Sequence, residues 1–326
     1  MKRLLLLLLM LGLAAEGAAQ ESSLYLSSQQ QPVQISLGAL YQNYTEDDNS
    51  ISEFSIPLML SIPVGDRFGL SLVANQASAT GDSLESVSGV SDAQVGVSYY
   101  QRLGRSSLVV SLGVNLPSGK RELTVDEFET SIFLSQHFYN FRVPGFGQGF
   151  NISPGFVFAF PAGENVVLGV GASYQVKGGF KPQEGMTDDY DPGDELLVTG
   201  GLDYRIDRAS NLSVDVTFTH YQSDALGDEE VYATGDKVTA TAQWLHYIGP
   251  HRIQLVGRYR SQSKSTRPAV FGQAEAELRT LPTQFLARGS YRHQVSPTLF
   301  LGVLAQGRIF DETTFFESKT LVDLGL

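Results

Sequence analysis

Stretches in which apolar and polar residues alternate with a period of two recur along most of this chain, and no other feature constrains its fold as strongly. In the clearest stretch, 107–116, Leu108, Val110 and Leu112 alternate with small or polar residues. Because successive strand residues face opposite sides, each stretch has one apolar face and one mixed face. We expect strands near 33–44, 51–62, 67–76, 92–102, 107–116, 149–160, 166–176, 195–206, 211–221, 237–247, 252–261, 282–293, 298–309 and 318–326. The expected fold class is all-β: an antiparallel transmembrane β-barrel of about 14 strands, within roughly 12 to 16.

The first residues have the pattern of an export signal. Lys2 and Arg3 precede an apolar stretch, 4–13, and small residues that suit cleavage follow it. We expect 1–19 to be a signal peptide, 20–31 a short periplasmic segment and 32–326 the barrel. The apolar stretch is too short for a spanning helix, and no later run of about 18 apolar residues occurs. The expected location is the cell outer membrane of a Gram-negative bacterium.

Short polar turns alternate with long connections along the chain. The short turns are 64–67, 103–106, 161–164, 207–210, 248–251 and 294–297, and the long connections are 75–91, 177–194, 222–236 and 261–280. Outer-membrane barrels have short periplasmic turns and longer outer loops. We therefore place the short turns on the periplasmic side and interpret the long connections as outer loops.

Aromatic residues support this orientation. On the apolar phase, Tyr99, Phe160, Tyr204, Trp244 and Tyr291 lie near short turns, and Tyr41, Tyr174 and Tyr259 lie near the opposite strand ends. Aromatic girdles at both rims are typical of a membrane barrel, whereas a soluble β-sandwich, the alternative fold, gives no reason for them. Pro57 and Pro154 fall within expected strands and require a bulge or break, because proline has no N–H to donate.

The stretch 117–148 does not follow the strand pattern. Thr124 and Glu127 have the spacing of a capping box, and Phe128, Ile132 and Phe138 follow near helical spacing. We expect a short helix over 125–138, inside an outer loop that is either extracellular or inserted into the lumen. A pair of ragged strands is the alternative.

Two motifs frame the start of this insertion. The stretch 89–99, GVSDAQVGVSY, and the stretch 116–119, LPSG, resemble patterns of the meta-pathway phenol-degradation and FadL-like outer-membrane transporters. The resemblance covers roughly 89–120. It implies passage of hydrophobic or aromatic small molecules through a barrel that internal segments partly block. The chain departs from the pattern because few residues precede the first strand and because it ends in Leu326, not in an aromatic residue.

Composition excludes several function classes. The formal charge of -12 argues against a nucleic-acid partner, which requires a basic surface. The chain has no cysteine, and its five histidines show no metal or catalytic spacing. No G-x-S-x-G motif occurs. We therefore expect no enzyme and no cofactor.

Charged residues on the mixed face are the candidate functional groups. The inward-facing candidates for a lumen constriction are Arg258, Arg260, Arg288, Arg292, Arg308, Asp203 and Asp215. They either form a neutralising network or select solutes by charge. Weak calcium candidates crowd one outer loop: Asp188, Asp189, Asp191 and Asp194. Their spacing matches no EF-hand, and a solvated acidic loop is the alternative.

Two functions fit these observations. The first is a channel or transporter for small, hydrophobic or aromatic solutes. The second is a plugged structural or adhesive barrel with acidic surface loops and no transport role. The expected partners are outer-membrane lipid, a small-molecule solute and the outer-membrane assembly machinery, with no nucleic acid.

Overall fold

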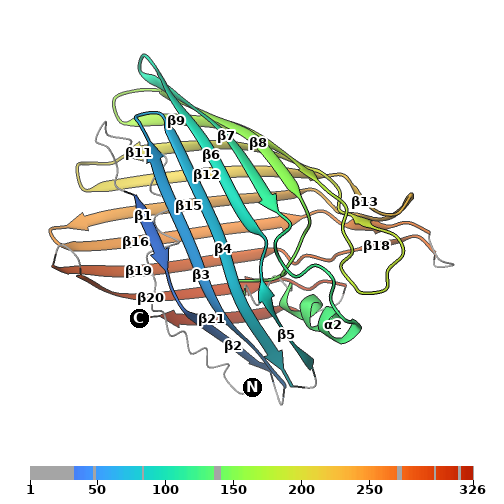
Figure 1. Cartoon of the computed structure of the whole chain (residues 1–326). Helices are drawn as coiled ribbons and strands as arrows, with labels where there is room; N and C mark the ends of the chain where they lie inside the picture. The colour runs from blue at the N-terminus through green and yellow to red at the C-terminus, as the bar shows by residue number, and fades with distance from the viewer. Residues whose placement is uncertain are drawn as a thin grey trace. The chain divides into compact units, whose positions relative to one another are not determined.

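The structure is a computed structural model that describes residues 33–46, 49–82, 84–135, 141–269, 274–296, 299–314 and 317–325. The expected signal peptide, 1–19, the segment 20–31 and Phe138 lie outside these residues. Most of the described chain is strand, with one short helix (Figure 1).

Hydrogen bonds link 14 strands of the described residues along one path that follows the chain. In order, they are β1 (Gln34–Leu37), β3 (Asn49–Val64), β4 (Phe68–Gly81), β6 (Ala93–Leu103), β7 (Ser106–Leu116), β8 (Asn151–Pro161), β9 (Val166–Lys177), β11 (Glu195–Arg205), β12 (Ser210–Tyr221), β15 (Lys237–Ile248), β16 (His251–Gln262), β19 (Gln284–Ser296), β20 (Leu299–Phe310) and β21 (Lys319–Gly325). Beside this path, β2 (Leu40–Glu46) pairs with β3, and β5 (Leu84–Val90) pairs with β4. The predicted fold class is confirmed in its strand content, its antiparallel pairing and its short helix.

The chain divides into two compact units. The first comprises Met1–Gln101, Val110–Pro154 and Val176–Asp191, and the second comprises Arg102–Val109, Gly155–Gln175 and Pro192–Leu326.

In the first unit, the strand that contains Pro57 is continuous, and the strand paired with it is interrupted opposite this residue. The neighbouring strand stops at the end of β1 and resumes as β2, with Gly38 between them donating its N–H to the carbonyl of Pro57 at 3.2 Å. Pairing continues in unchanged register, from Leu37 opposite Leu58 to Leu40 opposite Ser55. The strand of Pro57 itself has no bulge or break, so the expected interruption lies in the neighbouring strand and not at Pro57.

Pro154 has a different effect. Strand β8 runs through this residue without interruption. Proline's fixed φ is compatible with strand backbone, so the missing N–H alone does not end the strand.

The long connections contain more strand than the sequence indicated. Strand β4 continues to Gly81 and forms a hairpin with β5, and a two-residue strand, β10 (Tyr190–Asp191), lies in the next long connection. In the second unit, a small antiparallel sheet contains β13 (Ser223–Leu226), β14 (Glu229–Ala233), β17 (Ser265–Arg267) and β18 (Ala276–Leu278), in that order. The interpretation of these connections as plain loops was wrong, because strands that continue past the sheet satisfy their own backbone groups by pairing with each other.

Three of the short turns are built on glycine. Gly65, Gly104 and Gly249 have φ values of 62°, 64° and 57°. A left-handed residue suits a tight hairpin turn, and glycine adopts it without steric cost.

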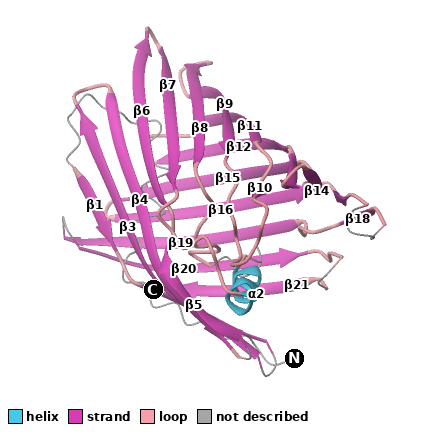
Figure 2. Cartoon of the chain, turned by 45° about the vertical axis from the view of Figure 1, so that its right-hand side comes forward, coloured by secondary structure: helices cyan, strands magenta, loops and turns pink. Residues whose placement is uncertain are grey.

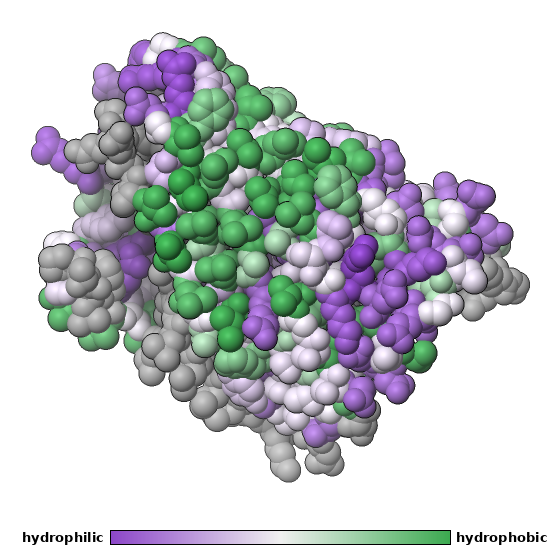
Figure 3. Space-filling model, viewed as in Figure 1, coloured by the Kyte–Doolittle hydropathy of each residue, from purple (hydrophilic) through white to green (hydrophobic). Residues whose placement is uncertain are grey.

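The strands have two faces of opposite character. In the second unit, Leu255, Phe285 and Leu301 are 50%, 51% and 60% exposed, and all lie on the predicted apolar phase. In the first unit, Figure 3 shows apolar side chains gathered over β3, β4 and β6. Among the described residues, no helix has the length and apolar character to cross a membrane.

Candidate functional site

The candidate site lies in the first unit, on the mixed phase of β2 to β5, where the described parts of the inserted segment, 117–135 and 141–148, cover the strands. Helix α2 (Val125–Leu134) packs against β5 (Figure 2). Beneath the segment lies an apolar cluster: Tyr44, Ile51, Ala77, Ala79, Val87, Leu123, Leu134, Phe141, Val143 and Phe146. The insertion therefore supplies half of a packed core and is not a free loop.

Asp92 fastens both ends of the insertion. Its carboxylate accepts hydrogen bonds from the backbone N–H of Gly119 at 2.8 Å and from that of Gln148 at 2.7 Å. A third bond comes from the Nδ2 group of Asn115, at 2.8 Å, and the same amide group donates to the carbonyl of Gly149 at 2.7 Å. One buried carboxylate thus joins the start and the end of the segment to the end of β7. We call this group the Asp92 clasp.

The residues of the Asp92 clasp and its surroundings belong to the two motifs that resemble those of a transporter family. Asp92 is the aspartate of the 89–99 motif, and Gly119 ends the LPSG motif. A Cβ at Gly119 would overlap the carbonyl oxygen of Phe146 and the backbone nitrogen of Asp92. Ser118 accepts the N–H of Ala93 at 2.9 Å. Both motifs therefore act together in seating the insertion.

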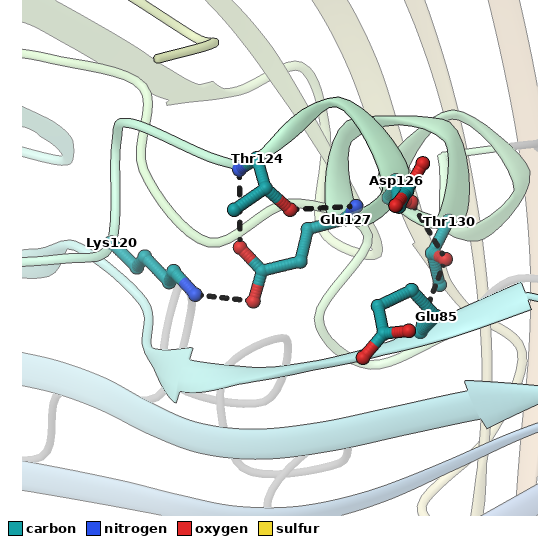
Figure 4. A network of polar contacts seen from close by, with 6 residues as sticks. All are labelled: Glu85, Lys120, Thr124, Asp126, Glu127 and Thr130. Carbon is teal, nitrogen blue, oxygen red and sulfur yellow. Dashed lines mark hydrogen bonds and ion pairs between the residues drawn. The ribbon is translucent and has the colours of Figure 1, made fainter.

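Helix α2 begins as the sequence predicts. Thr124 is the N-cap: its hydroxyl accepts the N–H of Glu127, and the Glu127 carboxylate accepts the N–H of Thr124 (Figure 4). Lys120 also donates to Glu127, and this hydrogen bond lowers the pKa of the Glu127 carboxyl. Thr130 donates to the carbonyl of Glu85 at 2.7 Å, which ties the helix to β5. The capping box is confirmed.

The length of the helix and the packing of its apolar residues agree only in part with the prediction. The helix ends at Leu134 with Ser135 as its C-cap, and positions 136–138 of the expected range lie outside the described residues. Phe128 packs against the apolar cluster, whereas Ile132 is 46% exposed and faces away. Phe138 lies outside the described residues. A ragged strand pair does not form over 125–134.

Sequence reasoning missed the residue at the centre of the buried surface, Glu53. It is 1% exposed, and both carboxylate oxygens lie 3.2 Å from the backbone nitrogen of Val143, which donates to them. A strand needs about 9–11 residues to cross a bilayer. Counted from the short turn at 64–67, the stretch 54–64 of β3 already supplies that length, so Glu53 lies outside the stretch that crosses. Burial raises the pKa of Glu53 to about 7, against the hydrogen bond from Val143 and the charge of Arg142. Only its odd-numbered position in β3, shared with Ser55, indicated that it faces inward.

The predicted arginines lie in the second unit, on the mixed phase of β16, β19 and β20. Arg258 lies opposite Leu286, which in turn lies opposite Arg308. The other three candidates occupy the same phase: Arg260 opposite Gln284, Arg288 opposite Val256, and Arg292 opposite Arg252. Arg308 is 2% exposed, with its guanidinium 5.9 Å from the centroid of the Phe310 ring.

The two predicted acidic residues lie apart from these arginines. In ladder register, Asp215 lies opposite Thr241, which lies opposite Arg258, so two strand spacings of about 4.8 Å, roughly 10 Å, separate acid from base. Asp203 accepts the hydroxyl proton of Ser213 at 2.5 Å. Among the described residues, neither acid forms an ion pair with an arginine. The arrangement segregates the two signs of charge.

The calcium candidates do not gather into a ligand shell. Asp194 accepts the hydroxyl of Tyr174 at 2.7 Å, and Asp188 accepts that of Thr187 at 3.1 Å. Asp189 and Asp191 are exposed. Within the described ranges, no three His, Cys, Asp or Glu side chains are placed to hold a metal ion.

One serine and one histidine that are 36 residues apart in the chain meet near a short turn. The Ser210 hydroxyl lies 2.6 Å from Nδ1 of His246 and 3.2 Å from Oδ2 of Asp207, and Ser210 is 7% exposed. Asp207 also accepts the N–H of Ala209 at 2.6 Å, and this bond lowers the pKa of its carboxyl. These contacts close the 207–210 turn onto β15.

No family model matches the chain, and no curated protein matches it either. Solved structures that resemble it include an outer-membrane channel from Pseudomonas putida F1, at 12% identity and a TM-score of 0.47, covering 72% of this chain and 91% of that one. An anion-selective porin from Comamonas acidovorans has 11% identity and a TM-score of 0.41, with 90% and 94% covered. OmpF of Salmonella typhi, in complex with daunomycin, has 7% identity and a TM-score of 0.43, with 90% and 96% covered. At such values the similarity carries no conclusion about function.

Proposed function

We propose that this chain is an outer-membrane channel for small, hydrophobic or aromatic solutes, and that the inserted segment and the segregated charges shape its path. In this proposal the exposed apolar phase contacts membrane lipid, the mixed phase lines a wet lumen, and the outer-membrane assembly machinery inserts the exported chain. The preference for hydrophobic or aromatic solutes rests on the motif resemblance alone.

The observation that carries the proposal is the separation of charge on the mixed phase. A barrel interior that served only as a packed structure would place a base beside Asp203 and beside Asp215, because a carboxylate without a compensating charge is costly in a dry interior. Asp215, on β12, instead lies two strand spacings from Arg258, on β16, and Asp203, on β11, lies three spacings from it. Charged groups in this arrangement favour a hydrated lumen, where fixed charges select among solutes.

The test replaces three of the arginines. In the variant R258Q/R260Q/R288Q, reconstituted in vesicles, we expect the reversal potential to shift toward cation selectivity, because the positive charge that excludes cations is lost. Thermal unfolding should change little, since an amide on a wet face stays solvated. The matched control is R67Q/R105Q/R208Q, which removes the same charge from three exposed residues of the short turns.

Two results would contradict the proposal. Unchanged selectivity with a stability loss of several kcal/mol would make the arginines a structural network. Absence of both conductance and solute uptake, in the native chain and in a variant that lacks residues 120–148, would favour the alternative of a plugged structural barrel.

A further inference from the structure

Three consecutive residues of the insertion, 141–143, are held by side chains and not by a strand ladder. The Phe141 ring meets the Tyr44 ring edge to face, with centroids 5.2 Å apart. The Arg142 N–H donates to Oε1 of Gln42 at 2.8 Å, and the Val143 N–H donates to Glu53. We call this attachment the Glu53 grip. The side chains of Gln42 and Glu53 accept these two backbone N–H groups, so the attachment depends directly on their chemical state.

The strand residues around Glu53 are uncharged, and Ser55, two residues along β3 and 0% exposed, supplies a hydroxyl that favours the ionised carboxylate. On β4, Ala79 lies directly opposite Glu53, and on β5 the buried Val87 carries no charge. On β2, the neighbours are Gln42, which lies opposite Glu53, and Tyr44. From the insertion, Arg142 supplies the one charge that acts on Glu53 among the described residues. A negative charge at Glu53 is therefore poorly solvated and only partly compensated.

The two attachments of the insertion differ in kind. In the Asp92 clasp, three donors converge on one carboxylate, which suits an ionised group and holds residues 119 and 148. In the Glu53 grip, the backbone N–H groups of Val143 and Arg142 and the hydroxyl of Ser55 favour the ionised carboxylate, but burial against apolar side chains outweighs them. The clasp can thus stay closed while the grip opens, so the part of the insertion near 141–143 can leave the strands without release of its ends.

We propose that Glu53 is a proton-controlled latch: its neutral form holds residues 141–143 on β2 and β3, and its ionisation releases them. Burial penalises the charged carboxylate more than its hydrogen bonds and the charge of Arg142 favour it, and release into water removes that penalty. This inference rests on the proposed channel only in its last step, in which release of the segment widens the path for solutes.

The direction of the pH effect follows from the raised pKa. The pKa is about 7 in the gripped state and 4.5 in water, so the gripped state binds more protons between these values. The grip is strongest below about pH 4.5 and is lost as the pH rises through about 7. Between pH 5 and pH 8, the ratio of released to gripped molecules should rise by up to roughly 70-fold.

Thiol labelling tests the latch without any need for transport. The chain has no cysteine, so Val143→Cys in the otherwise native full-length protein carries a single thiol, at a position that is 2% exposed in the gripped state. A second variant, Glu129→Cys, places a reference thiol at an exposed position of α2. The ratio of the two labelling rates with a water-soluble methanethiosulfonate cancels the pH dependence of the thiol itself.

We expect this ratio to rise at least about tenfold from pH 5 to pH 8 when Glu53 is present. Adding Glu53→Gln, which keeps the acceptor oxygen but cannot ionise, should flatten the profile at the low value. The matched control Glu85→Gln changes an exposed carboxylate on β5 and should leave the native profile unchanged.

An equal labelling ratio at pH 5 and pH 8 in the protein that retains Glu53 would overturn the latch. This result needs no Glu53→Gln variant, so it tests the latch even if that variant fails to assemble. A pH profile that persists in an assembled Glu53→Gln variant would overturn it as well. If labelling follows pH while vesicles show no conductance at either pH, the latch stands and the channel proposal fails.

Discussion

Replacing Asp92 by alanine tests the seating of the insertion most directly. The substitution removes three hydrogen bonds to a carboxylate and strands two backbone N–H groups, those of Gly119 and Gln148, together with the amide of Asn115. Hydrogen bonds to a charged group contribute about 1.5–3 kcal/mol each, and bonds that share one acceptor are not additive. We therefore expect the attachment of the segment to weaken by roughly 4–6 kcal/mol.

Limited trypsin digestion in mild detergent measures this effect. The insertion contains cleavage sites at Lys120, Arg121 and Arg142, and 4 kcal/mol corresponds to roughly a thousandfold larger released population. We expect fast cleavage within 117–148 in Asp92→Ala, while the strands keep their heat-modifiable migration. Ser118→Ala, which removes one neutral bond of about 1 kcal/mol, is the matched control and should be cleaved only slightly faster than the native chain. Equal cleavage of Asp92→Ala and the native chain would refute the clasp.

Two further pairs of substitutions test the assignment of the two faces of β7 and the tight packing at Gly119. Leu112→Arg places a charge on the apolar phase of β7 and should impair assembly, at a cost of about 2–4 kcal/mol near the bilayer midplane. Ser111→Arg places the same charge on the mixed phase and should fold. Heat-modifiable migration measures the assembly of both variants, and equal damage would mean that the assigned phase is wrong. Gly119→Ala should destabilise the insertion, because its Cβ meets the backbone of Phe146 and Asp92, whereas Gly200→Ala in β11 meets nothing within 4 Å and should be tolerated. Their thermal unfolding midpoints measure this difference, and no difference between the two would argue against the tight fit.

The sequence by itself determined the position of most of the long strands and the start of the helix. Side-chain alternation and turn chemistry are local, so the ranges 107–116, 166–176 and 211–221 were predicted to within a residue or two of β7, β9 and β12. The capping box at Thr124 was predictable for the same reason, since its partners are three residues apart.

The tertiary structure alone decided what those elements bring together. Glu53 meets a backbone N–H 90 residues away, and Asp92 meets one 56 residues away. Such contacts depend on how an insertion folds back onto its own strands, which no local pattern encodes. The ladder register likewise set Asp215 apart from Arg258 by one intervening strand, because the phase fixes the face of a residue but not its neighbours across that face.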